Sequence, residues 1–218
     1  DNKIPWKSVS VLVTSQFIVN SGFGFVIPVL PSFAAELGMG ATGVGIILSS
    51  PSISRLLVNQ PLGFAADRFG RKPLMVIGTI IMSISSVGTG FASSFATMFP
   101  FRLLMGLGTA AATAGSQAAM ADLTSNVPHH RAKLLGIQQT AITAAFVGGP
   151  MLGGILTELF GVRMAFFSSA VAALSCCIGY SILPETLKEK ITPFNNNDNN
   201  NNENNTKTHN HTKHTRTQ

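Results

Sequence analysis

The chain has 218 residues, of which 45% are hydrophobic and only 11% carry a charge, and its formal net charge is +6. Because soluble domains usually have about a quarter of their residues charged, this composition argues against a water-soluble protein. A soluble all-helical domain would have to bury six helices that are apolar on every side. The excess of Lys and Arg over Asp and Glu is not accompanied by a basic face or a recognition motif, so it does not indicate nucleic-acid binding.

Six stretches are long and apolar enough to cross a lipid bilayer as helices. About 20 mainly apolar residues, at ~1.5 Å per residue, span the hydrocarbon core. In chain order the predicted spans are 9–32, 43–65, 73–93, 96–119, 134–156 and 164–184. The sequence therefore predicts an all-α, multi-pass membrane protein over residues 1–184, with the lipid bilayer as its surroundings.

Positive charges alternate between the connections. They lie in the N-terminal flank, in the second and fourth connections and after the sixth span: Lys3, Lys7, Arg68, Arg71, Lys72, Arg131, Lys133, Lys188 and Lys190. The first and third connections have none, and the fifth has only Arg163. Because Lys and Arg mark the cytoplasmic side of a membrane protein, both termini are predicted to be cytoplasmic.

The last part of the chain, residues 185–218, has a different composition. Its Asn-rich run NNNDNNNNENN at 195–205 offers nothing to bury, so we expect a disordered cytoplasmic tail or linker. The histidines that follow this run are taken as an accident of composition, and the adjacent Cys176 and Cys177 cannot form an unstrained bridge. No metal site and no cofactor are predicted.

Two loops match each other at a constant separation. Gly63, Asp67 and Gly70 in the loop after the second span correspond to Gly154, Glu158 and Gly161 after the fifth. With three spans per unit, the second copy enters the membrane from the opposite side. The match predicts an inverted 3+3 repeat, a common build for transporters; a chance match is the alternative.

Three motifs carry a family resemblance. The loop 63-GFAADRFGRK-72 fits the pattern G-x-x-x-D-R-x-G-R-[KR] and resembles the signature loop of the major facilitator superfamily. Arg102, Gly106 and Gly108 match the family's R-x-x-x-G-x-G element. The run 149–154 matches G-P-x-x-G-G, which is typical of drug/proton antiporters, and the stretch 19–31 looks like the opening helix of tetracycline and multidrug exporters.

The resemblance covers residues 9–187 and implies the N-terminal six-helix half of a twelve-helix transporter rather than an enzyme. Its cargo would be a small organic solute, exported by alternating access and coupled to protons. The longer chain to which this half would belong, or a dimer partner, would supply the second six-helix half. The alternatives are a truncated membrane protein without transport and a carrier for a sugar or an organic anion.

The charged loop would act as a cytoplasmic gate. The residues assigned to it are Gly63, Asp67, Arg68, Gly70, Arg71, Lys72 and Asp122. Topology alone accounts for Arg68 and Lys72, whereas the resemblance implies that Asp67, Arg71 and Asp122 form the switchable pairs. Partly wet pairs of this kind are worth about 1 kcal/mol each.

Polar residues inside the spans are the candidates for the transport path. Arg102 and Arg55 lie in the hydrocarbon zone, where an Arg costs roughly 2.5–3.5 kcal/mol on insertion scales. The amides are Gln16, Asn20 and Gln138, for which hydrogen bonding between helices is an equal alternative. Asn20 stands where tetracycline-type exporters carry an Asp, and an amide cannot carry a proton.

Small residues recur along the fourth and fifth spans and predict close helix packing. They are Gly106, Gly108, Ala145, Gly149, Pro150, Gly153 and Gly154, with Ala145 in place of an expected Gly. Static packing accounts for most of them, and a rocking surface is the alternative.

Overall fold

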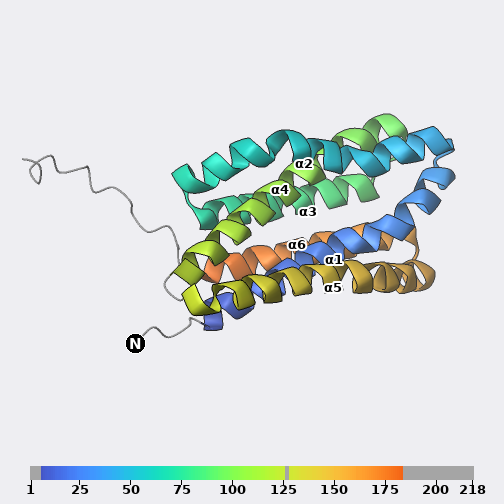
Figure 1. The fold of residues 1–218 in the computed structure, drawn as a ribbon. Helices are drawn as coiled ribbons and strands as arrows, with labels where there is room; N and C mark the ends of the chain where they lie inside the picture. Colours follow the sequence, from blue (N-terminus) through green and yellow to red (C-terminus); the bar gives the residue numbers. More distant parts are fainter. Residues whose placement is uncertain (1–5, 126–127, 184–218) are drawn as a thin grey trace, which may run out of the picture. The chain divides into compact units, whose positions relative to one another are not determined.

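The computed structural model describes residues 6–125 and 128–183, which form six helices (Figure 1). They are α1 (Trp6–Glu36), α2 (Ala41–Phe69), α3 (Arg71–Gly90), α4 (Phe95–Ser125), α5 (Pro128–Phe160) and α6 (Val162–Ile182). The described residues contain no strand, so the all-α prediction is confirmed. All six helices have the length and the apolar composition that crossing a membrane requires.

Each helix overlaps one predicted span, but the limits differ. Helices α1, α2, α4 and α5 extend past the apolar stretch at both ends, because helical hydrogen bonding continues where hydropathy falls. Helix α3 instead ends at Gly90, before the predicted limit at 93, and Phe91 caps it by donating its N–H to Val87 O. The predicted tail, 185–218, lies outside the described residues.

The two matched loops adopt the same backbone conformation. Gly70 joins α2 to α3 with φ 104° and ψ 157°, and Gly161 joins α5 to α6 with φ 85° and ψ 164°. Side chains with a Cβ rarely adopt such positive φ values, which glycine reaches at little cost. The correspondence seen in the sequence is therefore also a correspondence in structure, as an inverted repeat requires.

The helices pack as two groups of three, and each group combines helices from both repeat units. Helices α2, α3 and α4 pack together as one group, the α2/α3/α4 trio, and α1, α5 and α6 pack as the other, the α1/α5/α6 trio (Figure 1). The first helix of each repeat unit thus packs against the second and third helices of the other unit. The trios meet mainly through α3 and α6.

Burial is uneven among the six helices. The membrane-spanning parts of α2 and α5 are the least buried, and both expose large apolar side chains. Leu56, Leu57 and Phe64 lie exposed on α2, and Val147, Met151 and Leu159 on α5. Water does not solvate such surfaces favourably, so these two helices must face lipid or another protein.

Candidate functional site

A charged cluster joins three helices at one end of the α2/α3/α4 trio. Arg71 opens α3 directly after the Gly70 turn, and its Nη2 lies 2.8 Å from Asp67 Oδ1 of α2. Its Nε lies 2.8 Å from Asp122 Oδ2 of α4, as an ion pair rather than a well-aligned hydrogen bond. Its Nη1 donates a hydrogen bond to Ala66 O at 2.9 Å. The structure thus brings the three predicted switch residues together.

The members of this cluster differ in their access to solvent. The Arg71 side chain is only 11% exposed, whereas those of Asp122 and Asp67 are 31% and 71% exposed. Solvent screening at such carboxylates keeps the contribution of each pair to stability at about 1 kcal/mol or less. Each pair therefore adds little to the stability of the folded chain.

The other residues of the charged loop have plainer surroundings. Arg68 is exposed and lies over the Phe69 ring, with its Cζ 5.8 Å from the ring centroid. Lys72 is partly buried. A Cβ at Gly63 would meet no atom within 4 Å, so the structure shows no packing requirement for glycine there, in contrast to Gly70 with its positive φ.

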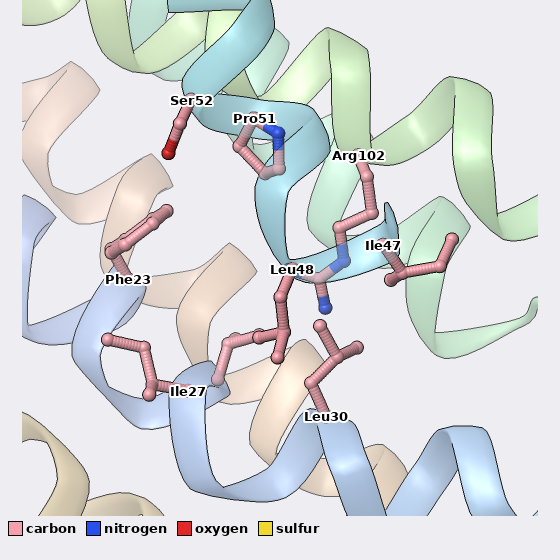
Figure 2. A pocket seen from close by; sticks show the side chains of 9 residues that line it. Phe23, Ile27, Leu30, Ile47, Leu48, Pro51, Ser52 and Arg102 are labelled. Atoms are coloured by element: carbon pink, nitrogen blue, oxygen red, sulfur yellow. The ribbon is translucent and has the colours of Figure 1, made fainter. Parts of the chain in front are cut away.

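The second constellation is a cavity around Arg102, near the other end of α4. This Arg102 cavity measures about 250 Å³ and is walled by α1 and α2 (Figure 2). Its lining residues are Phe23, Val26, Ile27, Leu30, Ile47, Leu48, Pro51, Ser52 and Arg102. Apart from Ser52 and the guanidinium, the lining side chains are apolar.

The guanidinium of Arg102 is buried with little polar compensation. The residue is 2% exposed, its Nη1 lies 3.6 Å from Met105 Sδ, and its Cζ lies 5.3 Å from the centroid of the Phe166 ring of α6. Neither Nε nor Nη2 has a hydrogen-bond partner among the described residues. A cation–π contact contributes up to about 2 kcal/mol, whereas burying an ion costs several kcal/mol. The charge is therefore under-compensated.

Backbones approach closely at most of the predicted small residues. A Cβ at Gly106 would clash with Pro51 O and lie 2.8 Å from Pro51 Cα, so α4 touches the backbone of α2. A Cβ at Gly108 would lie 2.7 Å from Gly78 O of α3. Since no side chain separates these backbones, they pack as small residues allow between membrane helices.

Helices α1 and α5 approach each other in the same way. A Cβ at Gly149 would lie 2.9 Å from Gly24 Cα, and one at Gly24 would lie 3.3 Å from Pro150 Cδ and from Ala145 O. A Cβ at Gly153 would clash with α1. Gly154 differs from the prediction, because it is exposed and a Cβ there would meet no atom within 4 Å.

A family model described as Major Facilitator Superfamily matches residues 12–213. The chain belongs to this superfamily. The superfamily's proteins are transporters rather than enzymes, in agreement with the resemblance carried by the motifs.

Two bacterial relatives illustrate the similarity. Multidrug resistance protein 1 of Bacillus subtilis is 36% identical over 178 residues, covering 82% of this chain and 45% of the relative. Quinolone resistance protein NorA of Staphylococcus aureus is 26% identical over 188 residues, covering 86% of this chain and 48% of the relative. The chain thus spans about half the length of the curated relatives that it matches.

Solved structures support the fold. The crystal structure of the human organic anion transporter MFSD10 (TETRAN) matches with a TM-score of 0.71 and 25% identity, covering 85% of this chain and 49% of that one. A peptide transporter crystallised with sulfate matches with a TM-score of 0.73 and 16% identity, over 80% of this chain and 37% of that one. The second likeness shows the fold alone.

None of the remaining polar candidates lines the Arg102 cavity. Gln16 is fully buried with both amide atoms unbonded among the described residues, and Asn20 donates to Gln16 O at 2.7 Å within α1. Gln138 of α5 donates to Ser116 Oγ of α4 at 3.1 Å. Arg55 is partly buried on α2.

Sequence reasoning missed the partners of two candidates: Phe166, whose ring lies beside Arg102, and Ser116, which bonds Gln138. Phe166 is one apolar residue among many in the sixth span, and Ser116 is one of several hydroxyls in the fourth. No spacing signal separates them from their neighbours, because each makes its contact with a helix far away in the sequence. A buried arginine does indicate that an aromatic ring or a polar partner should be sought nearby.

Proposed function

We propose that the chain forms the N-terminal six-helix half of an exporter that moves small organic solutes across a membrane by alternating access. The observation that carries the proposal is the cluster of Arg71, Asp67 and Asp122, which ties α2, α3 and α4 together at the end of the bundle where the signature loop lies. The relatives named for multidrug and quinolone resistance favour drug-like solutes as cargo.

The cluster would act as a cytoplasmic latch. Two states that differ by a few weak ion pairs can interconvert, and a solute that prefers one state shifts the balance towards it. We assign both termini and the loop 63–72 to the cytoplasmic side, following the distribution of positive charge. Labelling of a cysteine introduced at position 68, with Cys176 and Cys177 replaced, would test this side: reactivity only towards reagents added outside the cell would overturn it.

A second six-helix half would complete the path. The exposed apolar faces of α2 and α5 support a partner of this kind, either as the remainder of a longer chain or as a second copy. Crosslinking between cysteines placed on α2 and a co-expressed second half would test this partner, and lipid-only accessibility of both helices in an active transporter would contradict it.

Proton coupling would require an acid that the described residues do not place in the membrane interior. The four described acids, Glu36, Asp67, Asp122 and Glu158, all lie at or near helix ends, and Asn20 cannot titrate. We therefore assign the proton-carrying group to the second half. Efflux from vesicles with an imposed pH gradient tests this coupling, since transport indifferent to the gradient would exclude antiport.

The gate itself is tested by substitution in the transport-competent protein. Asp67→Asn removes the charge of one latch carboxylate while keeping the size of the side chain, and we expect slower solute export. Arg163→Gln on the exposed start of α6 is the matched control for a lost surface charge. Export by Asp67→Asn at the wild-type rate would remove the latch from the mechanism.

A further inference from the structure

We propose that the Arg102 cavity is a binding subsite for the carboxylate of a small, largely apolar organic acid. The inference deepens the proposed transport function, on which it rests for the role of the bound acid as cargo, by naming a chemical class of solute. Its physical basis is a buried cation without an anionic partner, aimed into a cavity that is otherwise apolar (Figure 2).

The charge of Arg102 is fixed and unmatched. Arginine stays protonated in proteins, and here Nε and Nη2 are unbonded among the described residues. Asp122 lies twenty positions further along α4, about 30 Å away at 1.5 Å per residue. Asp67 pairs with Arg71 at that same end, while Glu36 and Glu158 are exposed at helix ends. No described carboxylate pairs with Arg102.

The guanidinium selects the kind of anion. Its planar fork offers parallel N–H donors that match the two oxygens of a carboxylate, and such charge-assisted bonds are stronger than neutral ones. A neutral solute would leave the buried charge unmatched, and an organic cation would be repelled by it. The site therefore favours a carboxylate over its amide and over an amine.

The walls select the rest of the solute. Phe23 and Ile27 of α1 and Leu48 of α2 line the cavity beyond the guanidinium, and Ser52 is the other polar lining residue (Figure 2). A volume of about 250 Å³ falls below the roughly 300–1,000 Å³ of pockets for drug-sized ligands. An aromatic or short aliphatic acid fits this description.

The carboxylate has two sources that share this chemistry: a solute, or an acidic side chain of a second six-helix half. The lining favours the solute. A side-chain carboxylate needs only the space beside the guanidinium, whereas the cavity also includes Phe23 and Ser52 in its lining (Figure 2). The experiment below separates the two.

Binding to the purified chain in detergent is the first measurement, with the fluorescent acid 2-naphthoate as probe. Its amide, 2-naphthamide, and its amine counterpart, 2-naphthylmethylammonium, have nearly the same shape. We expect 2-naphthoate to bind roughly 10- to 100-fold more tightly than either, the usual size of a charge-assisted hydrogen-bonding contribution. Equal binding of the three compounds, or preference for the amine, would overturn the proposal.

Variants assign the binding to the cavity. Arg102→Gln should lose most of the discrimination between acid and amide, and Arg102→Lys should keep part of it because a charge remains without the fork. Arg163→Gln, an exposed arginine outside the cavity, should bind as the unaltered chain does. Leu48→Trp fills the cavity with Arg102 intact and should abolish binding, so it decides the question if Arg102→Gln does not fold. Wild-type binding by folded Arg102→Gln or by Leu48→Trp refutes the site.

Transport in the assembled protein separates the two sources of the carboxylate. Saturable, Arg102-dependent uptake or competition by 2-naphthoate supports a solute subsite. If other solutes are exported while 2-naphthoate neither competes nor is carried, a side chain occupies Arg102 and the proposal fails. If the acid binds but no solute is moved at all, the proposed transport function fails and the subsite stands.

Discussion

Gly153 and Gly154 of α5 are neighbours in the chain with opposite surroundings, so Gly→Ala at each gives a matched test of the contact between α1 and α5. A Cβ at Gly153 would clash with Phe25 O and lie 2.7 Å from Phe25 Cα, whereas a Cβ at Gly154 would meet no atom within 4 Å. Both changes add one methyl group within the same turn of helix.

The expected difference follows from these distances. Ordinary contacts between carbon atoms are about 3.5–4.0 Å, so the methyl group of Gly153→Ala overlaps backbone atoms by about 1 Å, and backbone atoms cannot rotate away. Overpacking of this kind costs about 1–3 kcal/mol. The gain in helix propensity from Gly to Ala, up to about 1 kcal/mol, applies to both variants and cancels in the comparison.

Thermal unfolding of the purified chain in detergent, followed by the helical circular dichroism signal, measures the difference. At roughly 2–4 °C per kcal/mol for a protein of this size, the Tm of Gly153→Ala should lie about 2–12 °C below that of Gly154→Ala. Gly154→Ala should match or exceed the unaltered chain. Equal Tm values for the two variants would show that α1 and α5 do not approach each other as described.

Four further substitutions test the other contacts. Gly106→Ala should lower the free energy of unfolding by about 1–3 kcal/mol, because its Cβ would clash with the backbone of α2. Gln138→Leu should lower it by about 1 kcal/mol through loss of its interhelical hydrogen bond. Gln16→Leu should leave it unchanged or raise it, since both amide atoms are unbonded. Asp122→Asn should lower it by about 1 kcal/mol or less, since its ion pair with Arg71 is partly exposed.

Denaturant titration in detergent checks these values side by side. Gln16→Leu and Gln138→Leu serve as controls for each other, because both replace a buried amide with the same apolar side chain. A larger loss for Gln16→Leu than for Gln138→Leu would mean that Gln16 has a partner that the described contacts lack. A stabilising effect of Gly106→Ala would exclude the close approach of α4 to α2.

The fold could be predicted from the sequence because its strongest signals are local. Apolar length gives each helix, and the matched glycines at 70 and 161 occupy turns that need a positive φ. The local charge pattern does not by itself pair these residues: the grouping of Arg71 with Asp67 and Asp122 follows from the family resemblance.

The interior of the site could not be predicted in the same way. Helices that are apolar on every side carry no periodic signal for which face meets which neighbour. The contacts of Arg102 with Phe166 and with the walls from α1 and α2 therefore have no trace in the sequence. For the same reason Gly154 was grouped with Gly153, although only one of the two faces α1.

The division into trios says how the latch and the cavity would be linked. Within each trio, helix backbones touch at glycines, so we expect each trio to move as a block. The Arg102 cavity is walled by α1 from one trio and α2 from the other. Its shape should therefore change when the trios shift against each other. Both ion pairs of Arg71 are internal to the α2/α3/α4 trio and cannot by themselves hold the trios together. The 71% exposed Asp67 side chain is the member that can reach a group outside its trio. Compared with Asp122→Asn, Asp67→Asn should therefore slow transport more and lower Tm less. Equal effects of the two variants on the transport rate and on Tm would contradict this division.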